Sequence, residues 1–333
     1  MKFIDLPVRN QQDFIRTMSV ETDIPEQIIE KDWWVSAVMR AIFALPYADA
    51  MSFKGGTSLS KCWSLIERFS EDIDVAVSRE FLGYGGELSR TQVSDKLRRA
   101  ACTFVREKLQ FDIRDKMIEQ GVNPDKFKVD VDITPVTTVD PEVIYVHYDT
   151  KFELLPYVKN FVKIEVSGRS MNEPLEDKEI RSMIEDRYPD SAFAEGKFTV
   201  PTVKPERTFI EKICLLHEEF RKETGEVRVS RMSRHLYDIV KIMKTPVADR
   251  ALADKELFAT IVEHRRKFIG LKGFDYSTLC AEKISIIPPE AVAEKWREDY
   301  ADMCEDMMYG DYPEFDELMV SIRELQERLR TCL

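Results

Sequence analysis

The feature that most constrains this chain is the stretch FKGGTSLSKCWSLIERFSEDIDVAV at residues 53–77, where a glycine pair precedes two aspartates placed one residue apart. Gly55 and Gly56 allow the backbone to turn tightly and to approach a ligand closely, because no Cβ is in the way. Asp72 and Asp74 alternate with apolar residues. This period of two predicts a strand with both carboxylates on one face.

The residues between these two elements complete a phosphate-binding pattern. We expect Thr57 or Ser58 to cap a helix whose free N–H groups and positive dipole end suit a phosphate. The apolar face of that helix would hold Leu59, Cys62, Trp63, Ile66 and Phe69. Two carboxylates on one face repel each other unless a cation lies between them, and Mg²⁺ bridges protein carboxylates and substrate phosphates. A lone Asp-x-Asp or Gly-Gly is weak evidence, but their ordered combination predicts a site for a metal-bound nucleoside triphosphate.

Composition limits the class of protein. The 333 residues are 44% hydrophobic and 33% charged, which is typical of a soluble globular protein with one large or two modest domains. No apolar run is long enough to span a membrane, and the start MKFIDLPVRN has no signal-peptide core. The six cysteines lie far apart and lack metal or redox spacing. We therefore expect a cytoplasmic protein with reduced thiols.

The net charge of −12 is unevenly distributed. Residues 298–317 contain nine acidic residues and no Lys or Arg, whereas residues 228–244 contain five basic residues against Asp238 alone. The acidic stretch predicts an amphipathic helix plus a loop, with docking of a basic partner as the alternative. Arg228, Arg231 and Arg234 would align on one side of a helix, either as a solvated face or as a phosphate track for RNA.

Hydrophobic periodicity predicts an α+β fold in three parts. Residues 1–50 read as helices, with Thr22-Asp23 capping a helix that Pro25 opens. Residues 51–200 form a mixed core with strands at KVDVDITPV, VIYVHYD and NFVKIEVSG and a helix at TQVSDKLRRAACTFVREKLQF. Pro201 and Pro205 bracket a junction, and residues 201–333 form a helical C-terminal domain. Trp33 and Trp34 are expected in the core.

A third carboxylate is expected near the first two, because two-metal transfer uses such a set. The alternating run VKIEV offers Glu165, and the run VDVDI offers Asp130 and Asp132 in the same pattern. A solvated strand face is the ordinary explanation for each of them. Lys163 and Arg169 could contact phosphates or simply flank a strand.

The stretch at residues 53–77 resembles the signature of the polymerase-beta-type nucleotidyltransferases. Within it, K-G-G-T-S-L together with R-F-S-E-D-I-D resembles the AbiEii/AbiGii toxin family. The resemblance extends over nearly the whole chain, through IIEKDWWV, NFVKIEVSGRS (160–170), TFIEKICLLHE (208–218), SRHLYDI (233–239) and EKWREDYADM (294–303). It implies a nucleotidyltransferase core, a helical C-terminal domain, and a bacterial toxin of a toxin–antitoxin or phage-defence pair.

The resemblance also implies roles for individual residues. Asp72, Asp74 and Glu165 would hold Mg²⁺ or Mn²⁺, and Lys212 would clamp the triphosphate. Asp238 would orient Lys212 or act as a base, with a salt bridge to Arg234 as the plain alternative. The triphosphate would lie at Lys54, Gly55, Gly56, Thr57 and Ser58. The acceptor would be RNA, most simply the 3′ end of tRNA, and a cognate antitoxin would neutralise the toxin.

Two other hypotheses remain open at this point. The fold could serve as a catalytically silent binding module that sequesters a partner, although the intact set of motifs speaks against this. The enzyme could also transfer its nucleotide to a protein or a small molecule, which the sequence does not distinguish from RNA.

Overall fold

The computed structural model describes residues 1–153 and 158–332, which form the predicted α+β fold with a mixed sheet and a helical C-terminal region. The chain divides into two compact units. The first comprises Met1–Cys62 and Phe69–Val203, and the second comprises Trp63–Arg68 and Lys204–Leu333. The N-terminal helices therefore belong to the same unit as the sheet.

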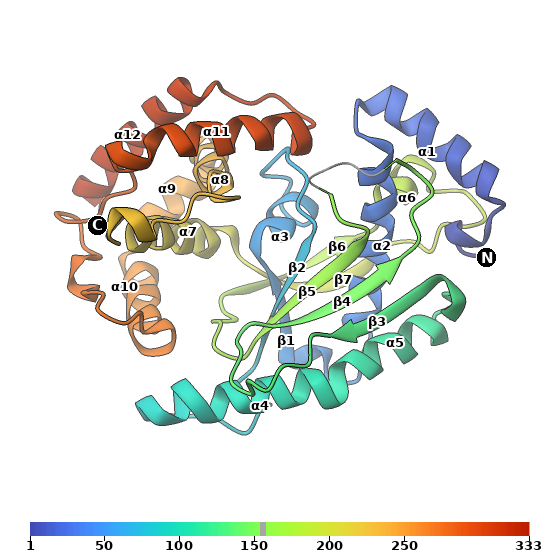
Figure 1. Ribbon diagram of the computed structural model, residues 1–333, viewed down its shortest axis with the longest axis horizontal. Coiled ribbons are helices and arrows are strands. Elements are labelled where there is room, and N and C mark those ends of the chain that lie inside the picture. The colour runs from blue at the N-terminus through green and yellow to red at the C-terminus, as the bar shows by residue number, and fades with distance from the viewer. Residues whose placement is uncertain (154–157, 333) are drawn as a thin grey trace. The chain divides into compact units, whose positions relative to one another are not determined.

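The first unit is built on a seven-stranded mixed sheet with the strand order β3-β4-β5-β2-β1-β7-β6 (Figure 1). β2 runs antiparallel to β1 and parallel to β5, so it lies at the centre of the sheet. The strands are β1 (Met51–Lys54), β2 (Asp72–Val77), β3 (Phe127–Val131), β4 (Glu142–Tyr148), β5 (Phe161–Ser167), β6 (Leu175–Ile180) and β7 (Phe198–Val203).

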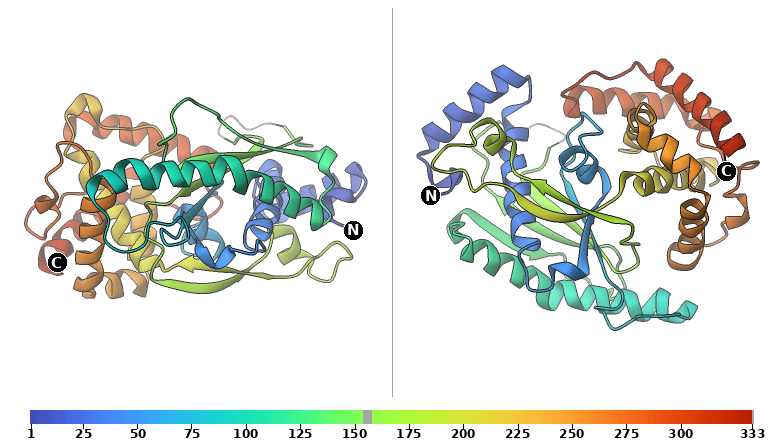
Figure 2. Two further views of the ribbon diagram at one scale, coloured as in Figure 1. Left: turned by 90° about the horizontal axis from the view of Figure 1, so that it is seen from below. Right: turned by 180° about the vertical axis from the view of Figure 1, so that it is seen from behind.

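One face of this sheet carries the hydrophobic core. The alternating apolar residues of β2, β4 and β5 pack there with α2 and with the long helical segment that ends in α5. Figure 2 shows this segment along the sheet from two further sides. The helices of the unit are α1 (Val8–Thr22), α2 (Glu26–Ile42), α3 (Gly55–Lys61), α4 (Arg98–Phe104), α5 (Gln110–Glu119) and α6 (Met183–Arg187), with π-helical turns at Gln92–Leu97 and Val105–Leu109.

The second unit is helical. Its helices are α7 (Pro205–Phe220), α8 (Arg234–Met243), α9 (Pro246–Ala253), α10 (Lys255–His264), α11 (Glu290–Met307) and α12 (Phe315–Cys332). The segment Trp63–Arg68 packs with them through a β-bridge between Arg68 and Met308 and through side-chain contacts. The acidic run 298–317 covers the end of α11, a connecting loop and the start of α12, as the sequence predicted.

Two local expectations are wrong. The helix after the glycine pair ends at Lys61 instead of continuing to Phe69, because the next residues cross to the other unit and Ser64 adopts a left-handed φ of 51°. Asp23 caps the end of α1, with φ of 57°, and does not begin α2. Pro201 lies inside β7, and the boundary between the two units falls after Val203, between Pro201 and Pro205.

Within the described residues, none of the helices is both long enough and apolar enough to cross a membrane.

Candidate active site

The face of the sheet opposite the core carries a compact set of charged side chains. Asp74 of β2 is the Cα partner of Lys54 in β1 and of Glu165 in β5, so these three side chains form one row across three strands. The next row pairs Asp72 with Lys163. Asp72, Asp74 and Glu165 are all half-buried, and strand pairing therefore brings together residues that are far apart in the sequence.

Gly55 lies directly against the carboxylate of Asp74. Its φ of +79° is in the region that favours glycine, and a Cβ built there would lie 1.9 Å from Asp74 Oδ2. Any side chain at position 55 would therefore have to displace this carboxylate. The sequence predicted a close backbone approach at the glycine pair, and in the described residues that approach is to Asp74.

Thr57 and Ser58 are turned toward the protein interior. Thr57 Oγ1 donates to the backbone oxygen of Asp72 and lies 2.9 Å from Ser70 Oγ, while Ser58 Oγ donates to the backbone oxygen of Gly55 at 2.8 Å. Both side chains are fully buried. Neither residue caps α3, which begins at Gly55 after Lys54. The two hydroxyls hold the glycine turn and β2 together.

Two ion pairs from α2 support this turn and strand. Lys31 pairs with Glu71, the residue before β2, and donates to the backbone oxygen of Lys159 at 2.7 Å. Asp32 pairs with Lys61 at the end of α3. All four side chains are buried or nearly so. The segment IIEKDWWV, which was noted from the sequence only as a family feature, thus supplies one partner of each ion pair.

Lys163 and Glu165 form an ion pair on the acidic face. Burial alone would lower the pKa of Lys163, but its hydrogen bond to Glu165 and the charges of Asp72 and Glu165 raise it above the ordinary value. Lys163 is therefore a stable cation between carboxylates of the two rows. The Lys163 side chain thus lies on the same face of the sheet as Asp72 and Glu165.

The alternative third carboxylates lie elsewhere in the sheet. Asp130 is in β3, two strands beyond β5, and binds His147 at 3.0 Å and Lys128 at 2.6 Å. Asp132 is exposed just after β3 ends. Of these residues, Glu165 alone is a direct neighbour of Asp74.

The donor set of Asp72 and Asp74 fits a hard divalent cation. Among the described residues, no three His, Cys, Asp or Glu side chains converge on one point. Mg²⁺ does not require such a cage, because it is commonly held by one or two carboxylates together with water and substrate phosphates. Two half-buried carboxylates of one strand, with Gly55 directly against Asp74, meet that need.

The second unit contains a buried charge cluster around Asp238. Arg68 binds both oxygens of this carboxylate, through Nε at 2.7 Å and Nη2 at 2.8 Å, and Lys212 Nζ lies 2.8 Å from Oδ2. His235 Nδ1 is 3.2 Å from Lys212 Nζ. The sequence predicted that Asp238 lies beside Lys212, whereas Arg68, a member of the quoted R-F-S-E-D-I-D motif, was not given a role.

This cluster carries more positive than negative charge. Burial would raise the pKa of Asp238, but the charges of Arg68 and Lys212 hold it well below its usual range. Burial lowers the pKa of Lys212, and the attraction of Asp238 only partly offsets this effect. His235 is buried near Lys212 and Arg234, and its pKa is held well below the ordinary value, so it is neutral. Two cations, Arg68 and Lys212, therefore contact one carboxylate, and the charge of Arg234 acts on Lys212 nearby.

The predicted arginine stripe does not form a helical face. Helix α8 begins only at Arg234, and Arg231 precedes it with φ of 61°. Arg228 binds Glu219 through Nη2 at 2.7 Å, and the backbone N–H of Arg231 is accepted by Asp299. The Arg228 side chain is therefore paired within the protein, whereas the contact of Arg231 is made by its backbone.

Comparison with solved structures supports the fold. MenT4, a nucleotidyltransferase toxin from Mycobacterium tuberculosis H37Rv, matches with a TM-score of 0.59 and 16% identity, over 97% of this chain and 90% of that one. JHP933 from Helicobacter pylori matches with a TM-score of 0.42 and 15% identity, over 93% of each chain. No curated protein sequence matched the chain.

A mixed sheet with paired aspartates beside a glycine turn, followed by a helical region, defines a nucleotidyltransferase. The family model of the AbiEii nucleotidyl transferase toxins, described as belonging to type IV toxin–antitoxin systems, matches residues 37–321. The chain belongs to this family, and it is a nucleotidyltransferase toxin.

Proposed function

We propose that this toxin transfers a nucleoside monophosphate from a nucleoside triphosphate to the 3′ end of tRNA. The observation that carries the proposal is the row formed by Asp74 and Glu165 next to the Gly55 turn, with Asp72 in the adjacent row. The reaction is an in-line attack of the acceptor hydroxyl on the α-phosphorus, with pyrophosphate as the leaving group. Positioning and charge neutralisation supply most of the rate in such transfers.

Each residue of the acidic face has a proposed task. Asp72 and Asp74 would hold Mg²⁺, with Glu165 beside them, and the bound ion would neutralise the charge on the phosphate oxygens. Lys163 keeps Glu165 in place through their ion pair. The φ of Gly55 and its missing Cβ keep the turn close to Asp74. The backbone N–H groups of Gly55, Gly56 and Thr57 would donate to phosphate oxygens, with Lys54 and Ser58 at the same turn.

Lys212 and Asp238 also receive proposed tasks. The surplus of positive charge around Asp238 suits a polyanion, so Lys212 would bind triphosphate oxygens. Asp238, held by Arg68, would fix the position of Lys212 rather than act as a base, because its depressed pKa makes it a poor proton acceptor at neutral pH.

A labelling experiment tests the proposal. The purified protein would be incubated with Mg²⁺, each labelled nucleoside triphosphate and total tRNA, in parallel with Asp74→Asn. We expect label on tRNA from the wild type only, and no label on tRNA whose 3′ end has been oxidised with periodate. Label that persists on oxidised tRNA, or that appears on protein or small metabolites instead, would contradict the tRNA 3′ end as acceptor.

The same variant tests the binding-module alternative. If growth inhibition depends on catalysis, Asp74→Asn will be harmless in cells at equal expression. Undiminished toxicity would favour sequestration of a partner. The family assignment implies an antitoxin, and co-expression of a cognate antitoxin should restore growth. Because tRNA and nucleoside triphosphates are the proposed substrates, we place the activity in the cytoplasm.

A further inference from the structure

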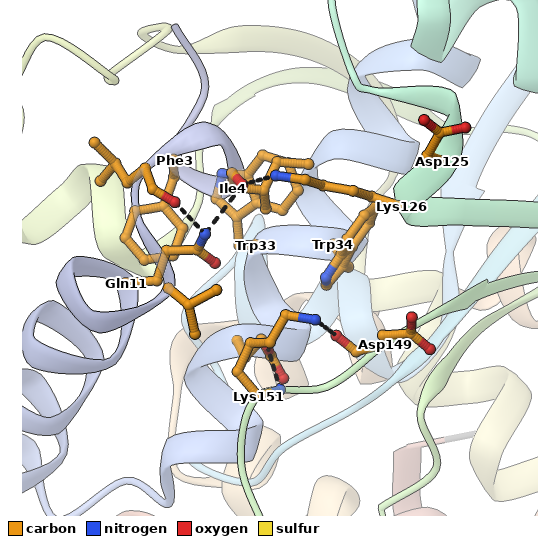
Figure 3. A pocket seen from close by; sticks show the side chains of 12 residues that line it. Phe3, Ile4, Gln11, Trp33, Trp34, Asp125, Lys126, Asp149 and Lys151 are labelled. Atoms are coloured by element: carbon orange, nitrogen blue, oxygen red, sulfur yellow. Dashed lines mark hydrogen bonds between the residues drawn. The ribbon is translucent and has the colours of Figure 1, made fainter.

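The first unit contains a cavity of about 210 Å³ that the proposed catalytic chemistry does not use (Figure 3). Its walls come from the N-terminal turn, the start of α1, one side of α2, and the loops beside β3 and β4. An apolar cavity of about 150 Å³ is known to hold benzene, so this one has room for a molecule of one or two rings. α2 packs on the core face of the sheet, whereas Asp72 and Asp74 project from the opposite face, so the two sites are separate.

Flat aromatic surfaces dominate one side of the cavity. Trp33 and Trp34 are both only 3% exposed, and Trp34 is stacked on Tyr148 with 5.0 Å between ring centroids. Phe3 adds a third ring from the N-terminal turn. The sequence placed both tryptophans in the core, which the structure confirms, but each also lines this cavity.

The indole N–H of Trp34 has no hydrogen-bond acceptor among the described residues, although the side chain is almost completely buried. Figure 3 shows the Trp34 nitrogen pointing toward the end of Lys151. The Lys151 ammonium donates to the backbone oxygen of Asp149 at 2.9 Å, which leaves two of its three N–H groups for another partner. At this end of the cavity, both the Trp34 indole N–H and the Lys151 ammonium can therefore donate to a bound molecule.

The opposite end offers an acceptor. The Gln11 amide nitrogen donates to the backbone oxygens of Ile4 at 3.0 Å and Leu6 at 2.7 Å, which fixes the orientation of the amide. Its oxygen accepts no hydrogen bond within the described part of the chain and points away from those carbonyls in Figure 3. Because Gln11 lines the cavity, this oxygen is available to a donor on a bound molecule.

We propose that this cavity binds a nucleobase. A base is a flat ring that stacks on aromatic side chains, and its edge carries both a carbonyl acceptor and an N–H donor. The acceptor would meet Trp34 and Lys151, and the donor would meet Gln11. A simple anion fits less well, because Glu30, Asp125 and Asp149 also border the cavity. The Glu30 carboxylate already accepts hydrogen bonds from the Thr150 hydroxyl and from the backbone N–H of Lys151.

The proposal is tested with nucleosides, which lack the phosphates that the catalytic face would bind. Binding of uridine, cytidine, adenosine and guanosine would be followed by tryptophan fluorescence and by ligand-observed NMR, with toluene as a ring that has no polar edge. Single-stranded RNA with and without one abasic position distinguishes a free nucleoside from a base presented by RNA.

Matched variants locate the binding. Val8 is 48% exposed and lines the cavity, whereas Val20 is 88% exposed at the far end of the same helix. We expect saturable binding that Val8→Phe abolishes and Lys151→Ala weakens about fivefold or more. Val20→Phe and Asp74→Asn should bind as the wild type does. Because Asp74→Asn removes transfer but not this binding, failure of the catalytic proposal and failure of this one give different results.

Three results would overturn the proposal. The first is no binding of any nucleoside up to about 10 mM. The second is binding that neither Val8→Phe nor Lys151→Ala changes, which would locate it elsewhere. The third is toluene binding as tightly as the nucleosides, which would make the cavity merely apolar.

Discussion

Glu165 of β5 is the direct Cα partner of Asp74 of β2 in a parallel strand pair. Adjacent strands are about 4.8 Å apart, so the two side chains leave the sheet side by side. Their repulsion is offset in part by Lys163, which is paired with Glu165 and lies opposite Asp72. Adding a divalent cation to this face would remove the remaining repulsion.

The first prediction distinguishes the two candidates for the third carboxylate. Glu165→Gln should reduce nucleotidyl transfer about 10- to 100-fold, the scale seen when a group next to a metal ligand is neutralised. Asp132→Asn should leave transfer unchanged, since Asp132 is exposed beyond the end of β3. Initial rates of transfer at saturating nucleotide, measured for both variants and the wild type, would distinguish the two candidates. A larger loss with Asp132→Asn would refute the assignment.

The second prediction concerns the glycine turn. Gly55→Ala should abolish transfer and lower the free energy of unfolding by about 1–3 kcal/mol, because alanine is strained at φ of +79° and its Cβ would overlap Asp74 Oδ2. Gly225→Ala is the matched control, because a Cβ there meets nothing within 4 Å. Chemical denaturation and the tRNA labelling assay measure both effects. Full activity in Gly55→Ala would show that the close approach to Asp74 is not needed.

The sequence predicts the four strands β2, β3, β4 and β5, but not β1, β6 and β7. β2, β4 and β5 alternate clearly between apolar and polar residues, because one face of each is buried. β1 is only four residues long, β6 is mostly exposed and charged as suits an edge strand, and β7 contains a proline. Each of these three lacks the alternating pattern, so none was predicted.

The candidate active site, too, could be predicted only in part from the sequence. A period of two places Asp72 and Asp74 on one face without any knowledge of the fold. That Glu165 lies beside Asp74 depends on strand order and register, which no local pattern encodes. Arg68 was missed for a related reason. Its segment leaves the sheet unit to bind Asp238, 170 residues further along the chain.

The third prediction concerns pH. Burial lowers the pKa of His217 to about 4, and its Nδ1 accepts the backbone N–H of Ser285 at 2.9 Å. The unfolded chain takes up a proton near pH 6.5, whereas the folded chain does so only near pH 4. Stability from this group is therefore complete above pH 6.5 and is lost as the pH falls toward 4, by about 3 kcal/mol at most.

The measurement compares the wild type with His217→Gln by chemical denaturation between about pH 4 and pH 8. The difference in unfolding free energy between the two proteins should shrink as the pH falls through this range. A difference that stays constant with pH would show that His217 titrates normally.

The last prediction separates the structural from the catalytic part of the Asp238 cluster. Asp238→Asn leaves Arg68 and Lys212 buried without a counter-charge, and should destabilise the protein by about 3–5 kcal/mol. Lys212→Met keeps the bidentate Arg68–Asp238 pair and removes one surplus cation, so it should remain folded. If Lys212 binds the triphosphate, this variant will nonetheless show a raised KM for nucleotide and slower transfer.

Arg250→Met, which breaks a surface ion pair with Glu206, is the control and should change stability by less than about 1 kcal/mol. Normal kinetics in a folded Lys212→Met protein would restrict the cluster to a structural role.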